Sequence, residues 1–166
     1  MDLEDLYDHH AQALFAFLLN LTRNEEDTKD LLQEVFIKLA RQPAALEGMR
    51  EPRAYLLRLA HNSAIDFFRR RAAREKYHEQ FGADCPEIFE SSADADELAF
   101  RQALSWALRD IPIEQRAVVH LKLWDGLTFE NIAQILNISI NTAGSRYRYA
   151  LDKLRERLRP LYDEIK

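Results

Sequence analysis

The chain has 166 residues, a net charge of −5 and a single cysteine, and only four glycines and five prolines interrupt it. A chain of this length holds one ordinary domain or two small ones. Cys85 has no partner for a disulfide or a CxxC metal site, the N-terminus is acidic where a signal peptide would be basic, and no apolar run is long enough to span a membrane. We therefore expect a cytoplasmic protein without membrane insertion.

The charge is segregated along the chain. Residues 1–52, 53–76, 77–100 and 101–166 carry net charges of −6, +5, −7 and +3. Two basic blocks alternate with two acidic blocks, and this pattern suits a protein with separate surfaces for a polyanion and for a basic partner.

The first part of the chain is expected to form three helices. Apolar residues recur at helical spacing through residues 3–21, and again through residues 31–39 after a cap at Asn24. Pro43 and Gly48 indicate a loop over residues 42–51, and Pro52 suits the first position of a long third helix. Because three amphipathic helices can cover one another, residues 1–78 are predicted to form one domain.

Residues 79–96 are acidic, lack a sustained period and are predicted to be a linker. Periodicity resumes at Leu98. Further helices are expected from Leu98, from Pro112 to a stop at Gly126, after a cap at Thr128, and after a cap at Ser139 to about Arg159. No strand pattern is present. The predicted fold class is all-α, with two small helical domains, residues 1–78 and 97–166, joined by the acidic linker.

The segment TFENIAQILNISINTAGSRYRYALDKLRER has the layout of a helix-turn-helix. A short helix is followed by a three-residue turn and a second helix that opens with small and polar residues. Ala133 is small where the helices would cross, Ile138 would fill the corner, and Ser139 would cap the second helix. The first turns of such a helix enter a major groove. The residues expected to contact duplex DNA are Asn141, Thr142, Ser145, Arg146, Arg148 and Tyr149. The alternative is a solvated, salt-bridged helix, but capping, turn length and charge placement agree on the helix-turn-helix.

Two constellations stand out in the first domain. Asp30, Gln33 and Glu34 share one helix face opposite apolar residues, and a merely solvated face is the alternative. The third helix interleaves arginines with aromatic residues, which suits single-stranded nucleic acid because bases stack while arginines track the backbone. The alternative is that its Phe67 and Phe68 belong to the core.

The segments DLLQEVFIKLAR, PRAYLLRLAHNSAIDFFRRR and LRDIPIEQRAVVHLKLWDGLTFENIAQILNISINTAGSRYRYALDKLRE resemble, in order and spacing, the extracytoplasmic-function (ECF) sigma factors of the sigma-70 family. The resemblance covers about residues 5–75 and 97–158. It implies an initiation factor that binds core RNA polymerase and promoter DNA and starts transcription. An anti-sigma factor is a common partner in this family and is expected here as well.

The resemblance also implies roles for individual residues. Region 2, in the first domain, would bind core polymerase through Asp30, Gln33 and Glu34. Its third helix would contact the melted −10 element, and the loop over residues 42–53 would capture a flipped −10 base. Region 4, the helix-turn-helix, would read the −35 element as duplex. The residues expected at the −10 element are Tyr55, Asn62, Asp66, Arg69 and Arg70.

Gly144 departs from the family pattern. The recognition helix of the family often reads GTVKSR, and Gly144 stands where that pattern has a basic residue. Glycine weakens a helix by about 1 kcal/mol relative to alanine. Two interpretations are open, a close approach of the backbone to the groove and neutral drift at a tolerant surface site. The −35 preference of relatives therefore does not transfer.

Two other classes of function remain as alternatives: a stand-alone helix-turn-helix regulator with a dimerising or sensing N-terminal module, and a helical adaptor that binds only protein. We expect no enzyme, catalytic residue or cofactor, since no phosphate loop, nucleophile elbow or HExxH helix is present. The five histidines lack ligand spacing, so no metal site is expected.

Overall fold

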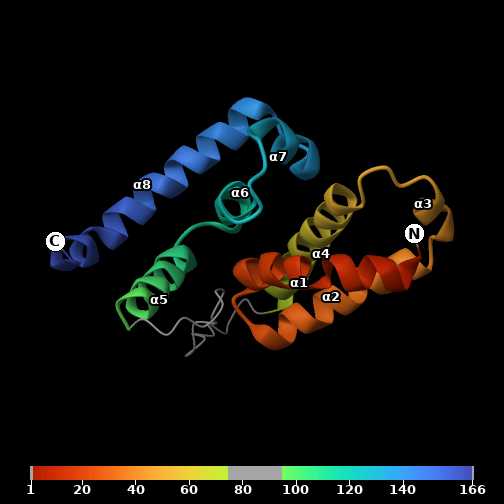
Figure 1. Cartoon of the computed structure of the whole chain (residues 1–166), viewed down its shortest axis with the longest axis horizontal. Helices are drawn as coiled ribbons and strands as arrows, with labels where there is room; N and C mark the ends of the chain where they lie inside the picture. The colour runs from red at the N-terminus through yellow and green to blue at the C-terminus, as the bar shows by residue number, and fades with distance from the viewer. Residues whose placement is uncertain (1, 75–94, 166) are drawn as a thin grey trace. The chain divides into compact units, whose positions relative to one another are not determined.

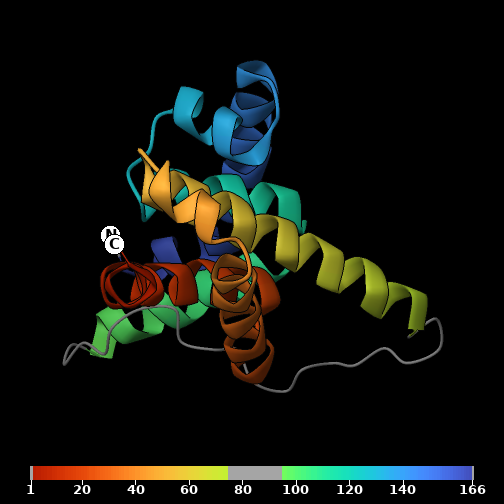
Figure 2. The same cartoon turned by 90° about the vertical axis from the view of Figure 1, so that its right-hand side faces the viewer.

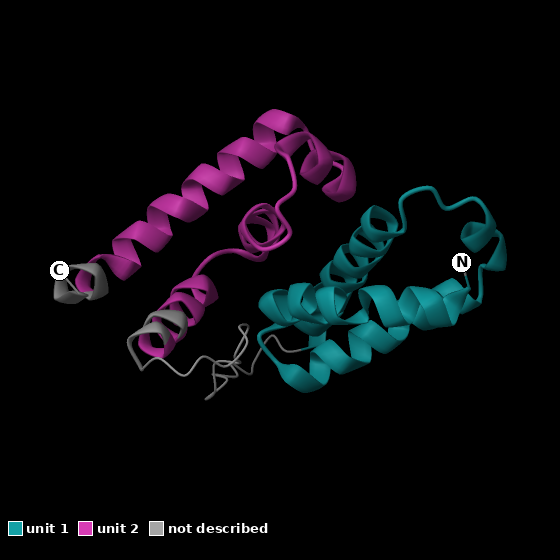
Figure 3. Cartoon of the chain, viewed as in Figure 1, with its two compact units in different colours: residues 1–82 teal, residues 83–166 magenta. Residues whose placement is uncertain are grey.

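The computed structural model describes residues 2–74 and 95–165, and within these residues it contains eight α-helices and no strand (Figure 1). The expected all-α fold class is confirmed. The chain divides into two compact units, residues 1–82 and 83–166 (Figure 3). Cys85 and all but the last two residues of the predicted linker lie outside the described residues. No helix of the described part is long and apolar enough to cross a membrane.

The first unit contains α1 (Leu3–Thr22), α2 (Glu25–Ala40), α3 (Pro43–Glu47) and α4 (Pro52–Arg74). Side chains cap the first two helices. The amide of Asp5 donates to Asp2 Oδ1 at 2.8 Å, and the amide of Asp27 donates to Asn24 Oδ1 at 2.9 Å. Such caps satisfy amides that have no partner inside the helix. The expected cap at Asn24 and the expected helix start at Pro52 are both confirmed.

The region between α2 and α4 differs from expectation. A loop was predicted over residues 42–51, but Pro43–Glu47 forms the short helix α3. Proline is tolerated at the first helical position, because its φ angle suits a helix and its missing N–H would have no partner there. Pro43 therefore begins a helix here as well as ending the preceding one.

The core of the first unit lies where α1, α2 and α4 pack against one another (Figure 1). Tyr7 is an exception among the periodic apolar residues of α1, since it stays half exposed and packs edge-on against Phe36 with ring centroids 5.0 Å apart. The most deeply buried side chains are those of Leu6, Leu14, Phe17, Leu18, Leu21, Leu31, Val35, Leu39, Leu56 and Leu57.

The second unit contains α5 (Ala95–Arg109), α6 (Ile113–Leu123), α7 (Phe129–Leu136) and α8 (Ile140–Ile165). Helix α5 begins three residues before the expected start at Leu98, because polar residues extend a helix without adding to its apolar period. Helix α8 does not end near Arg159 but continues through Pro160. Pro160 is exposed, so water can reach the carbonyl that loses its hydrogen bond there.

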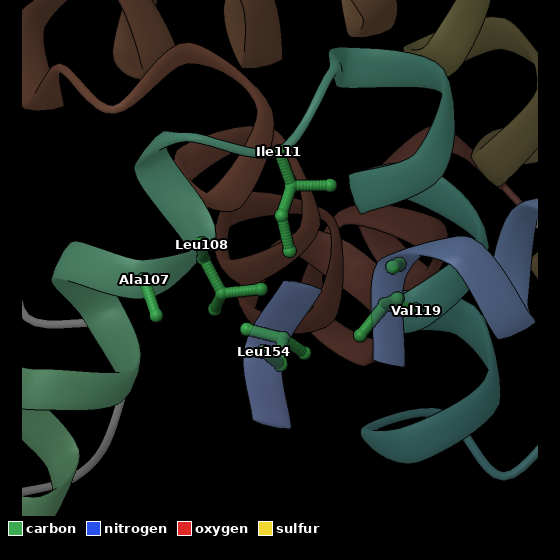
Figure 4. Close-up of a cluster of buried hydrophobic side chains, with 6 residues drawn as sticks. Ala107, Leu108, Ile111, Val119 and Leu154 are labelled. Carbon is green, nitrogen blue, oxygen red and sulfur yellow. The ribbon is translucent and has the colours of Figure 1, made fainter. Parts of the chain in front are cut away.

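Helices α5, α6 and α8 share an apolar cluster. Leu108, Ile111, Val119 and Leu154 point toward one another (Figure 4), and the buried Ala107 and Ala150 belong to the same cluster. Gly126, after α6, has a φ of 65°, so the predicted stop at this glycine uses a left-handed conformation that other residues rarely adopt. Helix α7 lies beside the start of α8 (Figures 1 and 2).

Candidate protein and nucleic-acid interfaces

The face of α2 predicted to bind a protein is solvent-accessible. Asp30 and Gln33 are exposed and Glu34 is partly exposed, while Leu31 and Leu32 between them are buried. Because residues three and four apart lie on one side of a helix, these side chains form one acidic and polar strip. The structure thus brings the three predicted residues together.

Glu34 also contacts residues of its own chain. Its Oε1 lies 3.2 Å from Lys38 Nζ and 4.0 Å from an Nη of Arg70 on α4. Lys38 Nζ in turn donates to the hydroxyl of the buried Ser63 at 3.0 Å. The i, i+4 spacing of Glu34 and Lys38 is readable from sequence, but the contacts with Ser63 and Arg70 are not. The side chain of Glu34 therefore connects the acidic strip of α2 with the basic part of α4.

A second ion pair joins the same two helices. Arg71 Nη1 donates to Asp27 Oδ2 at 2.9 Å, and both side chains are partly buried. The Arg71 guanidinium also lies over the Phe67 ring, 5.8 Å from its centroid. Phe67 contacts Phe68 edge-on at 5.4 Å, and both rings are half buried. Arg71 is thus partly buried by its contacts, whereas the neighbouring arginines Arg69 and Arg70 are exposed.

The predicted −10 residues occupy an open side of α4. Asn62, Asp66 and Arg69 are all exposed, and their spacing of four and three residues places them on one face. Tyr55 lies apart from them near the start of the helix, where it is half buried.

A pocket of about 380 Å³ opens beside Tyr55. It is formed by α3, the segment that follows it and the first turns of α4. Its lining combines an aromatic ring with charged groups and small or flexible residues: Ala44, Ala45, Gly48, Met49, Arg50, Glu51, Ala54, Tyr55 and Arg58. An aromatic face beside guanidinium groups can stack on a base and hold the phosphate next to it.

In the second unit, α7 and α8 form a helix-turn-helix. The Thr128 hydroxyl caps α7 by accepting from the amide of Asn131 at 3.1 Å. Asn137 takes a left-handed conformation with φ 56° and ends α7, and the amide of Ile138 then donates to the carbonyl of Ala133 at 3.0 Å. Ala133 and Ala143, one on each helix, are buried between the two. Small residues at both positions let the helices approach closely.

Ser139 caps the second helix as expected. Its Oγ accepts from the amide of Thr142 at 3.0 Å, and its hydroxyl donates to Thr142 Oγ1 at 2.8 Å. Thr142, which is predicted to contact DNA, is therefore also part of the cap. This contact between Thr142 and Ser139 was not predicted from the sequence.

The other residues predicted to contact duplex DNA also lie on α8. One face of α8 carries Asn141, Ser145 and Arg148. Asn141 and Arg148 are exposed, and Ser145 is half buried. Tyr149 is 63% exposed and Arg146 is half buried. Among the described residues no group of three or more His, Cys, Asp or Glu side chains could hold a metal ion.

Comparison with known proteins accounts for both units. Residues 6–74 match the family model of sigma-70 region 2, and residues 107–156 match that of sigma-70 region 4. The chain is 30% identical over 165 residues to the ECF RNA polymerase sigma factor SigX of Bacillus subtilis, covering 96% of this chain and 85% of SigX. It is 31% identical over 158 residues to SigL of Mycobacterium tuberculosis, covering 94% of this chain and 88% of SigL.

A solved structure has the same fold. It is the sigma factor RpoE in complex with the anti-sigma factor NepR from Bartonella quintana, with a TM-score of 0.69 at 24% identity, covering 89% of this chain and 90% of that chain. The helical units with their matching sequences thus define a protein built from sigma-70 regions 2 and 4. The chain belongs to the ECF sigma factors of the sigma-70 family.

Membership in this family establishes the function. The protein binds core RNA polymerase, recognises the −10 and −35 promoter elements and starts transcription. A stand-alone helix-turn-helix regulator or a helical adaptor would have no need of sigma-70 region 2, whose family model residues 6–74 match.

Proposed function

We propose that the tasks of this sigma factor are divided between its two units. Residues 1–78 bind core polymerase and the melted −10 element, residues 97–166 read the −35 element as duplex, and residues 79–96 link them. The segregation of exposed polar faces carries the proposal: an acidic strip on α2, an arginine-rich face on α4 and a polar face at the start of α8.

Asp30, Gln33 and Glu34 are proposed to bind core polymerase. Glu34→Lys reverses one of the two acidic charges of the strip and places a cation beside Lys38 and Arg70. Charge reversal in an interface of paired charges costs about 2–5 kcal/mol, so affinity for core polymerase should fall more than roughly tenfold. Binding is measured by titrating labelled core enzyme with the variant.

Glu25→Lys is the matched control for this experiment. Glu25 is exposed in the first turn of the same helix, more than two turns before Glu34, and its Oε1 lies 3.5 Å from Nζ of Lys29. Circular dichroism melting separates loss of binding from loss of fold. Equal affinity of a folded Glu34→Lys variant and the wild type would refute the assignment to α2.

The α4 face and the Tyr55 pocket are proposed to hold the separated −10 strand. Asn62 can hydrogen-bond a base edge, Arg69 and Arg70 can follow the backbone, and Asp66 serves as a base reader or a structural residue because it cannot approach phosphate unpaired. The pocket beside Tyr55 suits a base turned out of the stack, since its lining offers an aromatic ring and arginines together.

The polar face of α8 is proposed to read the −35 element. Arg148 is exposed next to Ser145, with Nη2 3.4 Å from the serine Oγ. Arg148→Ala should remove about 1–3 kcal/mol of discrimination at one base pair, whereas loss of a phosphate contact would weaken all sequences alike. Selection from a promoter library by reconstituted holoenzyme distinguishes the two patterns. An unchanged preference would contradict a base-reading role.

We further propose that the protein works in the cytoplasm, performs no covalent chemistry itself and is held by an anti-sigma factor until a signal releases it. The RpoE structure, in which a sigma factor of this fold is bound to its anti-sigma factor, supports the last point. Purification of the tagged full chain from its own host under non-inducing conditions, followed by mass spectrometry, should recover one stoichiometric partner other than polymerase subunits. Recovery with polymerase alone would argue against it.

A further inference from the structure

The recognition helix carries an exposed aliphatic side chain at its very start. Ile140 is the first residue of α8 and is 54% exposed. The large aliphatic residues of α7, Ile132, Ile135 and Leu136, are buried, and Ile138 in the turn is half buried. Ile140 thus takes no part in the core, and it lies at the end of the helix that is proposed to approach DNA.

Gly144 leaves Ile140 uncovered. Residues i and i+4 of a helix lie one above the other, so a side chain at position 144 would be the natural cover for Ile140. A Cβ built at Gly144 would have no atom within 4 Å, and its φ is not in the left-handed region. Neither packing nor backbone conformation requires glycine here. What the glycine does is leave an open apolar strip, Ile140 and the bare backbone at Gly144, beside the polar face formed by Asn141, Ser145 and Arg148.

We propose that this strip reads thymine in the −35 element, with Ile140 contacting the C5-methyl group. The inference rests on the proposed placement of α8 in the major groove. The N-terminal residues of a recognition helix are those that reach base edges, and the thymine methyl is the one apolar group among the base edges of that groove. The missing side chain at position 144 allows the base to approach Ile140 without displacing a longer residue.

The test uses full-length protein reconstituted with core polymerase. A promoter library first identifies the preferred −35 element. Each thymine of that element is then replaced by deoxyuridine, which differs only by lacking the C5-methyl group, and holoenzyme binding is measured by competition. At one position the replacement should weaken binding by the wild type about fourfold, the factor that corresponds to burial of one methylene-sized group. With Ile140→Ala the same replacement should have no effect.

Two further variants sharpen the result. Gly144→Gln places a long uncharged side chain over Ile140 and should also abolish the difference between thymine and deoxyuridine. Leu123→Ala removes an equally exposed aliphatic side chain, 53% against 54%, outside the recognition helix, and should leave the difference intact.

The outcomes separate this inference from the proposed function. A preferred element in which no thymine is sensitive to deoxyuridine overturns the inference, and so does a sensitivity that Ile140→Ala leaves unchanged. If Arg148→Ala alters the library preference while Ile140→Ala does not alter the methyl effect, only the thymine contact is wrong. If neither variant changes any preference, the placement of α8 in the groove is wrong as well.

Discussion

At the scale of single residues, His120 shows how burial decides a protonation state. Its ring is 1% exposed and stacks on Trp124, with centroids 5.3 Å apart and planes 10° from parallel. Burial lowers the pKa of His120 from 6.5 to about 3. Asp125 Oδ2 lies 3.7 Å from Nε2, and its charge would favour protonation, but the cost of desolvating an imidazolium outweighs it. His120 is therefore neutral in the folded protein at pH 7.

This depressed pKa predicts a pH dependence of stability. Between about pH 6.5 and pH 3 the unfolded chain binds a proton at His120 that the folded chain does not. The free energy of unfolding should then fall with decreasing pH by up to about 1.4 kcal/mol per pH unit from this group. Both tryptophans, Trp106 and Trp124, lie in the second unit, so their fluorescence in urea titrations at pH 7, 6 and 5 follows this unit alone.

The control for this prediction is His120→Gln, which cannot titrate. Its stability at pH 7 will be lower, because a well-packed ring is lost, but its dependence on pH between 7 and 5 should be flatter than that of the wild type. Identical slopes in the two proteins would show that folding does not lower the pKa of His120.

At the scale of elements, α8 combines recognition with a local weakness. Its start is well defined by the Ser139 cap, its inward residues Ala150 and Leu154 join the core of the second unit, and its fifth residue is Gly144. The fold does not require this glycine. The helix is therefore less stable than it would be with alanine at position 144.

Gly144→Ala should stabilise the second unit by about 1 kcal/mol, which raises the melting temperature of a unit this size by roughly 4–8 °C. Tryptophan fluorescence during thermal unfolding measures the change. The alanine is too short to cover Ile140, so discrimination between thymine and deoxyuridine should persist.

Gly126→Ala is the matched control. A Cβ there also meets open space, but the φ of 65° is unfavourable for alanine, so this variant should be destabilised by about 1 kcal/mol. Destabilisation of both variants to the same extent would mean that Gly144 has a structural role.

At the scale of the whole molecule, acidic and basic surfaces are separated along the chain although the net charge is −5. Within the first unit the acidic strip on α2 and the arginines of α4 are close enough for Glu34 and Arg70 to lie 4.0 Å apart. A net negative chain has little affinity for DNA alone, because phosphate contacts with Lys and Arg supply most non-specific binding.

We expect the isolated full-length protein to bind promoter duplex no more tightly than about 10⁻⁶ M at physiological salt, and to bind it specifically only with core polymerase. Fluorescence anisotropy with labelled promoter and scrambled duplexes, with and without core enzyme, measures both. Tight and salt-resistant binding by the isolated chain would instead favour a stand-alone regulator.

Much of this protein was readable from the sequence because the signals are local. The caps at Asn24, Thr128 and Ser139, the stop at Gly126 and the turn between α7 and α8 each depend on residues within a few positions of one another. Apolar periodicity then located the long helices, and the all-α class followed. The loop predicted at Pro43 is a helix because proline suits a first turn. The last helix was expected to end near Arg159, but an exposed helix can pass through a proline such as Pro160.

Only the tertiary structure decided how the predicted residues interact. Glu34 contacts Arg70, and Lys38 contacts Ser63. The partners lie on different helices, and helical periodicity predicts neighbours only within one helix. The exposure of Ile140 beside an unobstructed Gly144 was likewise invisible in the sequence, where an isoleucine at a helix start reads as another core residue. The reason is physical: caps and helical faces are set by neighbours along the chain, whereas burial, ion pairing and the openness of a surface depend on which helices pack together.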